Sequence, residues 1–343
     1  MKTPKTSVVP VYVSLAAIAA LAVALWGIGT ALQSVLTLWA FQIILLCGIA
    51  IVSAVSLNIV NGFTGQFSIG HAGFMLVGAY SSAGITVFAS PFLTRLMQSV
   101  HVPLGAQGAI LFAIAIVCAA IGAAFMGLLV GLPSLRLRGD YLAIATLGFG
   151  EAIRAIFVTV DAVGGASGLH NMPGYTNFTW VFLCATLVIL MARGLAMSCH
   201  GRALFAIRDD EIAAQAVGIN TFRYKVLAFV MSSAWAGVAG ALISHRNMGI
   251  SPQDYGFMMS SMVVVMVVFG GVGSITGAII AAVLLTLPTE LMRLEPHLSH
   301  YRLVIYPVIL VILMLLRPQG LLGRKEFRLG SIFGLGRTKG GEQ

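Results

Sequence analysis

Residues 255–287 read YGFMMSSMVVVMVVFGGVGSITGAIIAAVLLTL, an apolar run without any Asp, Glu, Lys or Arg. The glycine-rich GGVG at 270–273 divides this run into two halves. Each half is shorter than the roughly 20 residues that a transmembrane helix needs. Irregular backbone is tolerated at membrane depth where it is buried in protein or lines a cavity. We therefore expect a broken, re-entrant segment near 257–287, and a kinked helix without a functional role is the alternative.

The composition of the whole chain also indicates a membrane environment. Of the 343 residues, 59% are hydrophobic and 9% are charged, and the mean hydropathy is +0.97. Soluble domains carry about a quarter charged residues, which argues against a soluble fold. The net charge of +9 comes from basic residues scattered between apolar runs, so a continuous nucleic-acid-binding face is excluded. We expect an all-α membrane protein, a polytopic helical bundle.

Nine apolar segments are candidate membrane spans. Lys2 and Lys5 precede the first of them, and the positive-inside rule then predicts a cytoplasmic N-terminus. If 257–287 is re-entrant, the number of crossings is even and the basic C-terminal tail is cytoplasmic too. We expect one transmembrane domain over 1–323, with a cytoplasmic segment at 200–224 and a basic cytoplasmic tail at 324–343. The candidate spans are 11–31, 37–60, 67–89, 106–132, 141–160, 178–199, 225–245, 257–287 and 302–316.

Motifs for catalysis or for cofactor binding are missing from the sequence. There is no GxxxxGK[ST] phosphate loop and no HExxH motif, so an ATP-driven process would need its nucleotide on another subunit. The stretch GASG (165–168) resembles the motif of rhomboid intramembrane serine proteases, with His245 as a conceivable partner for Ser167. Its Gly-, Pro- and Asn-rich surroundings are typical of a loop. We therefore expect no enzyme, and no metal or cofactor on this chain.

Several polar residues fall within or beside the candidate spans. Glu151 lies near the middle of 141–160, with Arg154 one turn later, and Asp140 is placed to cap the helix N-terminus. Polar groups in the bilayer are costly and often functional. A self-neutralised ion pair and hydrogen bonds between helices are the structural alternatives. The candidates for a translocation path or gate are Asn58, Gln66, Ser68, His71, Glu151, Gly270, Gly271 and Gly273.

A charged block, GRALFAIRDDEIAAQAVGINTFRYK (201–225), interrupts the apolar pattern. Asp209 or Asp210 can cap a short helix there, and Gly218 suits the position just after its end. An apolar stripe, formed by Ile212, Ala216 and Ile219, follows helical spacing. A helix this short is marginal alone in water, so it packs either on its own bundle or on a partner.

This block resembles a known motif, because EIAAQAVG (211–218) is similar to the E-x-A-A-x-x-x-G loop of ABC importer permeases. Further stretches of the sequence resemble the LivM/LivH permease family of branched-chain amino acid ABC transporters, in particular its LivM-type subunits. The order and number of the matching runs make the resemblance specific over about 58–323. They are NGFTGQFSIGHAGFMLVGAY, LPSLRLRGDYLAIATLGFGEAIRA, VGGASGL, GRALFAIRDDEIAAQAVGINTFRYKVLAF, GGVGSITGAI and RPQGLLG.

The resemblance implies a type II ABC importer fold in the bacterial inner membrane. It implies a second homologous permease subunit, two cytoplasmic ABC ATPase subunits that hold ATP and Mg, and a periplasmic substrate-binding protein. The implied activity is import of leucine, isoleucine and valine by alternating access, although related members carry urea, short amides or other amino acids. The residues implied to couple to the ATPase are Arg202, Arg208, Asp209, Asp210, Glu211, Ala213, Ala214 and Gly218.

A second hypothesis is an ion-coupled secondary transporter that works alone. Glu151 would then be its coupling group, because a carboxylate within a span can carry a proton or bind an ion. The two hypotheses differ in what drives uptake, since only the first needs an ATPase partner.

Overall fold

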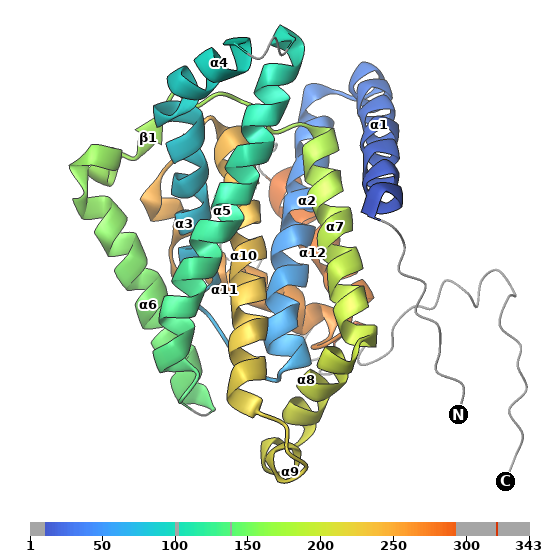
Figure 1. Ribbon diagram of the computed structural model, residues 1–343, viewed down its shortest axis with the longest axis vertical. Coiled ribbons are helices and arrows are strands. Elements are labelled where there is room, and N and C mark those ends of the chain that lie inside the picture. Colours follow the sequence, from blue (N-terminus) through green and yellow to red (C-terminus); the bar gives the residue numbers. More distant parts are fainter. Residues whose placement is uncertain (1–10, 100–102, 138, 293–319, 322–343) are drawn as a thin grey trace, which may run out of the picture.

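The computed structural model describes residues 11–99, 103–137, 139–292 and 320–321. Most of its helices run along the long axis of one bundle, and α1 (Val11–Val35) lies at the edge beside α2 (Leu38–Asn58) and α7 (Phe178–Met197) (Figure 1). The expected span 302–316 and the tail 324–343 lie outside the described residues.

The remaining elements follow in chain order, and two of them are π-helical continuations of α-helices. They are η1 (Ile59–Phe63), α3 (His71–Ala83), η2 (Gly84–Phe88), α4 (Ser90–Ser99), α5 (Leu104–Ser134), α6 (Asp140–Thr159), η3 (Asp161–Val163), η4 (Gly165–Ser167), β1 (Leu169–His170), α8 (Cys199–Asp209), α9 (Glu211–Ala216), α10 (Thr221–Asn247), β2 (Gly249–Ile250), η5 (Pro252–Tyr255), α11 (Phe257–Gly270) and α12 (Ile275–Leu291). Of these, β1 and β2 form a short antiparallel pair, with Leu169 opposite Ile250.

Within the described residues, seven helices are long and apolar enough to cross a membrane. The segment 257–287 is not among them, because it forms two shorter apolar helices, α11 and α12, joined by a turn at 271–274. The glycines of this turn adopt left-handed backbone angles, with φ of +109° at Gly271 and +94° at Gly273. The interruption expected at GGVG is therefore present, and it separates two helices rather than kinking one.

The expectation that Asp140 caps α6 is wrong. The cap position is Gly139, whose φ of +59° and ψ of −135° favour glycine, and Asp140 is the first residue of the helix. No side-chain hydrogen bond caps this end. Asp140 therefore keeps a favourable place near the positive end of the helix dipole but makes no cap bond.

Small residues hold the centre of the bundle together. Helix α10 packs against α3 and α5, and Gly240 and Gly237 of α10 touch the backbone of α3 at Met75 and Gly78. A methyl group on Gly237 would also lie 2.5 Å from the Ala119 carbonyl oxygen of α5. Glycines let helix backbones approach this closely, as is common between membrane helices. These three helices therefore form a tightly packed unit.

Helix α11 crosses the bundle from α6 to α2. At its start, the Phe257 amide donates to Glu151 Oε1 of α6 (3.0 Å), and Ser260 Oγ accepts from the Ala72 amide of α3 (2.9 Å). At its far end, the turn at 271–274 meets Asn58, the last residue of α2. The turn between α11 and α12 is thus held by an element that lies far from it in the sequence.

Candidate functional site at the α9 end of the bundle

Helix α9 projects from one end of the bundle, opposite α4 (Figure 1). Asp210 caps it, because its Oδ1 accepts from the amides of Ile212 (2.8 Å) and Ala213 (3.0 Å). Gly218 follows the helix with a φ of +87°, and the Ile219 amide donates back to the Ala214 carbonyl (3.0 Å). Both expected ends of the short helix are confirmed, with Asp210 rather than Asp209 as the cap.

The sides of α9 differ sharply in exposure. Ala214 is buried, whereas the side chains of Ile212 and Val217 are 73% and 77% exposed. The stripe expected from Ile212, Ala216 and Ile219 is only partly right, because Ile219 follows the end of the helix and is half-buried. An apolar surface made of Ile212 and Val217 therefore faces away from the bundle.

Two side-chain contacts fix α9 to α10. Lys225 Nζ lies 2.6 Å from Glu211 Oε2, and Gln215 Nε2 donates to Thr221 Oγ1 (2.9 Å). The side chain of Lys225 is 8% exposed and that of Glu211 is 30% exposed, so the ion pair lies at the edge of the protein interior. Since α10 packs closely against α3 and α5, α9 is anchored to the tightly packed centre of the bundle.

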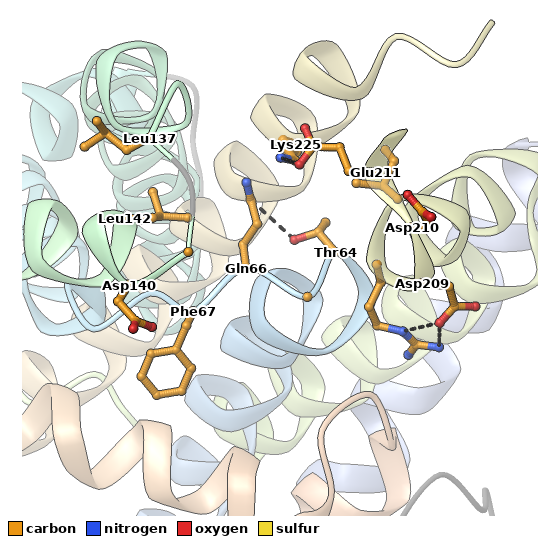
Figure 2. A pocket seen from close by; sticks show the side chains of 14 residues that line it. Thr64, Gln66, Phe67, Leu137, Asp140, Leu142, Asp209, Asp210, Glu211 and Lys225 are labelled. Carbon is orange, nitrogen blue, oxygen red and sulfur yellow. Dashed lines mark hydrogen bonds and ion pairs between the residues drawn. The ribbon is translucent and has the colours of Figure 1, made fainter. Parts of the chain in front are cut away.

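A cavity of about 370 Å³ lies beside α9 (Figure 2). The loop after η1 lines it with Thr64 and Gln66, and the start of α6 lines it with Asp140. In Figure 2, Asp140 and Asp209 lie on opposite sides, with Gln66 between them. Four carboxylates in all line the cavity, along with Arg208 and Lys225, which makes its wall polar and mixed in charge. The four are Asp140, Asp209, Asp210 and Glu211.

Arg208, at the end of α8, points into the bundle. Its Nη1 donates to the Gly62 carbonyl (3.2 Å), and its guanidinium carbon lies 5.0 Å from the centre of the Phe205 ring. Phe205 in turn meets Phe63 edge to face, with ring centres 5.2 Å apart. The Arg208 side chain is 20% exposed and also forms an ion pair with the 61% exposed Asp209, because its Nε and Nη2 each donate to Asp209 Oδ1 (3.4 Å).

The end of α2 connects this region to the α11–α12 turn. The side chain of Asn58 is fully buried, and its Oδ1 accepts from the Gly273 amide (2.9 Å) while its Nδ2 donates to the Ser274 carbonyl (3.2 Å). A methyl group on Gly62 would lie 2.6 Å from the Gly273 backbone nitrogen. The backbones of η1 and of the turn are therefore in direct contact.

The other candidates from the 58–74 stretch make hydrogen bonds within the protein. Gln66 bonds to Thr64 (3.3 Å) and lines the cavity. The Ser68 amide donates to Asn61 Oδ1 (3.1 Å), and His71 Nε2 shares a hydrogen bond with Ser56 Oγ (3.1 Å). Within this stretch, Gln66 opens on the cavity, whereas Ser68 and His71 fasten the start of α3 to η1 and α2.

Glu151 lies away from the α9 cavity. Its Oε2 accepts from Arg154 Nε (2.7 Å), as the spacing predicts, and its other oxygen caps α11 at Phe257. Both side chains of the pair are about one third exposed. Gly270 lies at the other end of α11, where its backbone is in close contact with the backbone of Gly277 in α12. Glu151 and Gly270 thus hold the two ends of one helix.

The remaining residues of the candidate coupling set lie on the outer surface of α8 and α9. Arg202 is exposed and donates to Cys199 Sγ (3.1 Å), and Ala213 and Gly218 are exposed as well. The candidate residues chosen from the sequence did not include Lys225, Gly62 or Val217, although the charged block contains Lys225 and the motif EIAAQAVG contains Val217. Lys225 and Gly62 join it through long-range contacts, and their local sequence carries no sign of these.

The protease-like arrangement suggested by GASG is absent from the described residues. His245, the conceivable partner, is buried and bonds to Thr86 Oγ1 (2.9 Å) and to the Ala241 carbonyl (2.9 Å). Ser167 lies in an exposed loop, where only its carbonyl contacts a histidine ring, that of His170 (2.8 Å). The described part of the chain also contains no cluster of His, Cys, Asp and Glu fit to bind a metal.

These helices and their apolar surfaces define a multi-pass helical membrane protein of the transport-permease class. Residues 39–314 match the family described as the permease component of branched-chain amino acid transport systems, and the chain belongs to that family.

Known relatives agree with this assignment. The chain is 34% identical to the high-affinity branched-chain amino acid transport permease LivM of Salmonella typhimurium, covering 85% of this chain and 71% of the relative. It is also 34% identical to LivM of Escherichia coli, covering 80% and 68%. LivH of Escherichia coli is 38% identical over 37% of this chain and 40% of LivH. No solved structure matches the chain significantly.

Proposed function

We propose that this chain is the permease subunit of an ATP-driven importer of leucine, isoleucine and valine. The importer moves its substrate from the periplasm to the cytoplasm by alternating access in the bacterial inner membrane, with both chain termini in the cytoplasm. The family assignment and the relatives named LivM support the substrate class. Urea, short amides or other amino acids are the alternative substrates within the same family.

The observation that carries the ATP-driven part of the proposal is the outer surface of α9. Ile212 and Val217 are largely exposed there, beside the exposed carboxylate of Asp209. An apolar pair rimmed by charge is typical of a contact with another protein. Because the chain has no phosphate loop of its own, the partner that best fits this surface is an ATPase subunit holding ATP and Mg.

The proposed assembly contains a second permease, two ATPases and a periplasmic binding protein. The likeness to both LivM and LivH relatives supports a pair of homologous permeases. The exposed apolar side chains of α5, such as Val117, Ile121 and Phe125, suit contact with membrane lipid or with the second permease. The exposed carboxylates and apolar residues at the α9 end suit the ATPases.

Co-purification and reconstitution test this proposal. The tagged chain is co-expressed with candidate ABC ATPase, permease and binding-protein genes from the same organism, purified, and placed in liposomes with the binding protein. Uptake of labelled leucine, isoleucine, valine and urea is then measured with and without ATP. We expect ATP-dependent uptake of the three amino acids and none of urea.

A matched pair of variants separates docking from folding. Ile212→Glu combined with Val217→Glu is expected to abolish co-purification of the ATPase, because it puts charge into the apolar contact. Phe92→Glu on α4 is the control, since Phe92 is 70% exposed at the opposite end of the bundle. Uptake by the chain alone, driven by an ion gradient, would instead support the secondary transporter and overturn the proposal.

A further inference from the structure

The α9 end of the bundle contains two separate attachments to the rest of the protein. One joins α9 to α10 through the ion pair between Glu211 and Lys225 and the bond from Gln215 to Thr221. The other is Arg208, which joins α8 to η1 through the Gly62 carbonyl. The first attachment ends in the packed centre of the bundle, whereas the second leads toward the α11–α12 turn.

The environment of Arg208 shows that Nη1 and the aliphatic part of the side chain belong to this second attachment, while Nε and Nη2 donate to Asp209 Oδ1 (3.4 Å). The guanidinium lies over the Phe205 ring, and Phe205 packs edge to face on Phe63 of η1. A methyl group on Gly65 would lie 2.8 Å from Arg208 Cγ, so the chain of Arg208 runs along the backbone of the loop after η1. Hydrogen bonding, ring stacking and backbone contact together fix η1 to α8.

The second attachment continues from η1 into the turn. Gly62 lies so close to Gly273 that any side chain on Gly62 would displace the turn. Asn58 bonds to both the amide of Gly273 and the carbonyl of Ser274. A buried amide with both its donor and its acceptor used on one turn fixes the position of that turn.

The turn also sets the position of α11. At its other end, α11 is held by Glu151 of α6 and by the bond between Ser260 and the Ala72 amide. With that end fixed, a displacement of the turn would change the tilt of α11 across the bundle, between α6 and α2. Backbone contact between Gly270 and Gly277 makes α12 follow the same movement.

We infer that Arg208 is a positioning residue that transmits movement of the α8–α9 segment to the α11–α12 turn through Gly62 and Asn58. This inference rests on the proposed function, because it is the ATPase bound at α9 that supplies the movement. In this arrangement Arg208 does not dock the ATPase. It converts ATPase closure into a tilt of α11, while Glu211 and Lys225 hold α9 on the packed centre.

Arg208→Met tests the inference in the complete transporter complex. The methionine keeps an apolar side chain over Phe205 but can neither donate to Gly62 nor pair with Asp209, so Asp209→Asn is measured beside it to isolate the loss of that ion pair. Arg193→Met is the matched control, because Arg193 is an exposed arginine on α7, outside the segment 200–224. Three quantities are measured for each variant: the ATPase that co-purifies, the rate of ATP hydrolysis, and the substrate imported per ATP hydrolysed.

We expect the Arg208→Met complex to keep its bound ATPase and its rate of ATP hydrolysis. The substrate imported per ATP should fall about tenfold or more, because a charge-assisted hydrogen bond is lost. Arg193→Met should match the wild type in all three. An Arg208→Met complex that loses its ATPase would show that the residue is a docking residue and would overturn the inference. An unchanged yield of substrate per ATP would overturn it too.

Two further variants test the inference if Arg208→Met does not accumulate in the membrane. Arg208→Lys keeps a positive donor and is expected to import an intermediate amount per ATP. Asn58→Ala removes both bonds to the turn without burying a charge, so it should lower the yield per ATP with the ATPase still bound. Wild-type yields for both variants would reject the inference. A failure of the proposed function can be told apart from a failure of this inference, because the wild-type complex would then show no ATP-dependent uptake.

Discussion

The ion pair between Glu211 and Lys225 is unequal in its exposure, and this predicts unequal effects of removing either partner. The side chain of Lys225 is 8% exposed and that of Glu211 is 30% exposed, at a distance of 2.6 Å. Glu211→Met leaves a buried ammonium group without its counterion. Lys225→Met leaves a carboxylate that water can reach. Glu, Lys and Met have similar helix propensities, so the backbone preference of α9 and α10 hardly changes.

The expected free energies follow from these exposures. Removing one partner of a buried pair costs about 3 kcal/mol at the lower end of the usual range, which we assign to Glu211→Met. Removing the partner of a partly exposed charge costs about 1 kcal/mol, which we assign to Lys225→Met. The opening of α9 would then become more frequent by roughly a hundredfold in the first variant and about fivefold in the second. The double variant buries no unpaired charge and should lie near the Lys225→Met value.

Hydrogen exchange of the purified chain in lipid nanodiscs measures this opening. The rate is followed in a peptide covering 211–217 and compared with a peptide from the middle of α10, which reports on the packed centre. We expect Glu211→Met to exchange fastest in 211–217, followed by Lys225→Met and the double variant, with the α10 peptide unchanged. Faster exchange in Lys225→Met than in Glu211→Met would refute the reasoning, as would additive effects in the double variant.

Two further predictions concern the cap of α9 and the crossing of α11 with α12. Asp210→Ala removes a cap with two amide bonds, so it should weaken α9 by about 1 kcal/mol and speed its hydrogen exchange about fivefold, whereas Asp209→Ala, which removes no cap bond, should leave exchange unchanged. If the two exchange alike, Asp210 is not the cap. Gly270→Val places a methyl-bearing carbon within 2.5 Å of the Gly277 carbonyl group, so overpacking of about 1–3 kcal/mol should lower the thermal unfolding midpoint in detergent. Gly194→Val on α7 meets open space and serves as the control, and an equal midpoint for both variants would argue against the backbone contact.

Local features of this protein could be read from the sequence because they depend on neighbouring residues. The cap at Asp210 and the left-handed Gly218 need only the residues of α9 itself. The pair between Glu151 and Arg154 follows from one turn of helix, and the break at GGVG follows from glycine. The cap expected at Asp140 was wrong because Gly139, the residue before it, adopts a backbone conformation that displaces the cap position.

The parts of the candidate site that come from distant segments could not be read in this way. Asn58 looked like a polar residue for a translocation path, and the structure uses it to hold Gly273 across a separation of 215 residues. Arg208 looked like a residue for the ATPase surface, yet its side chain turns toward Gly62. Glu151 looked like a buried charge within a span, and its second oxygen caps a different helix.

The sequence by itself determined that this chain is a helical membrane protein with a charged helix at one end and a broken apolar segment. Hydropathy, helix capping and the backbone freedom of glycine depend on a few neighbouring residues, so they can be predicted from the sequence. The tertiary structure alone decided which elements meet at the α9 end, and how α8 reaches the α11–α12 turn. Those contacts depend on how closely glycines let the helices approach, and that distance is set by the packing of the whole bundle.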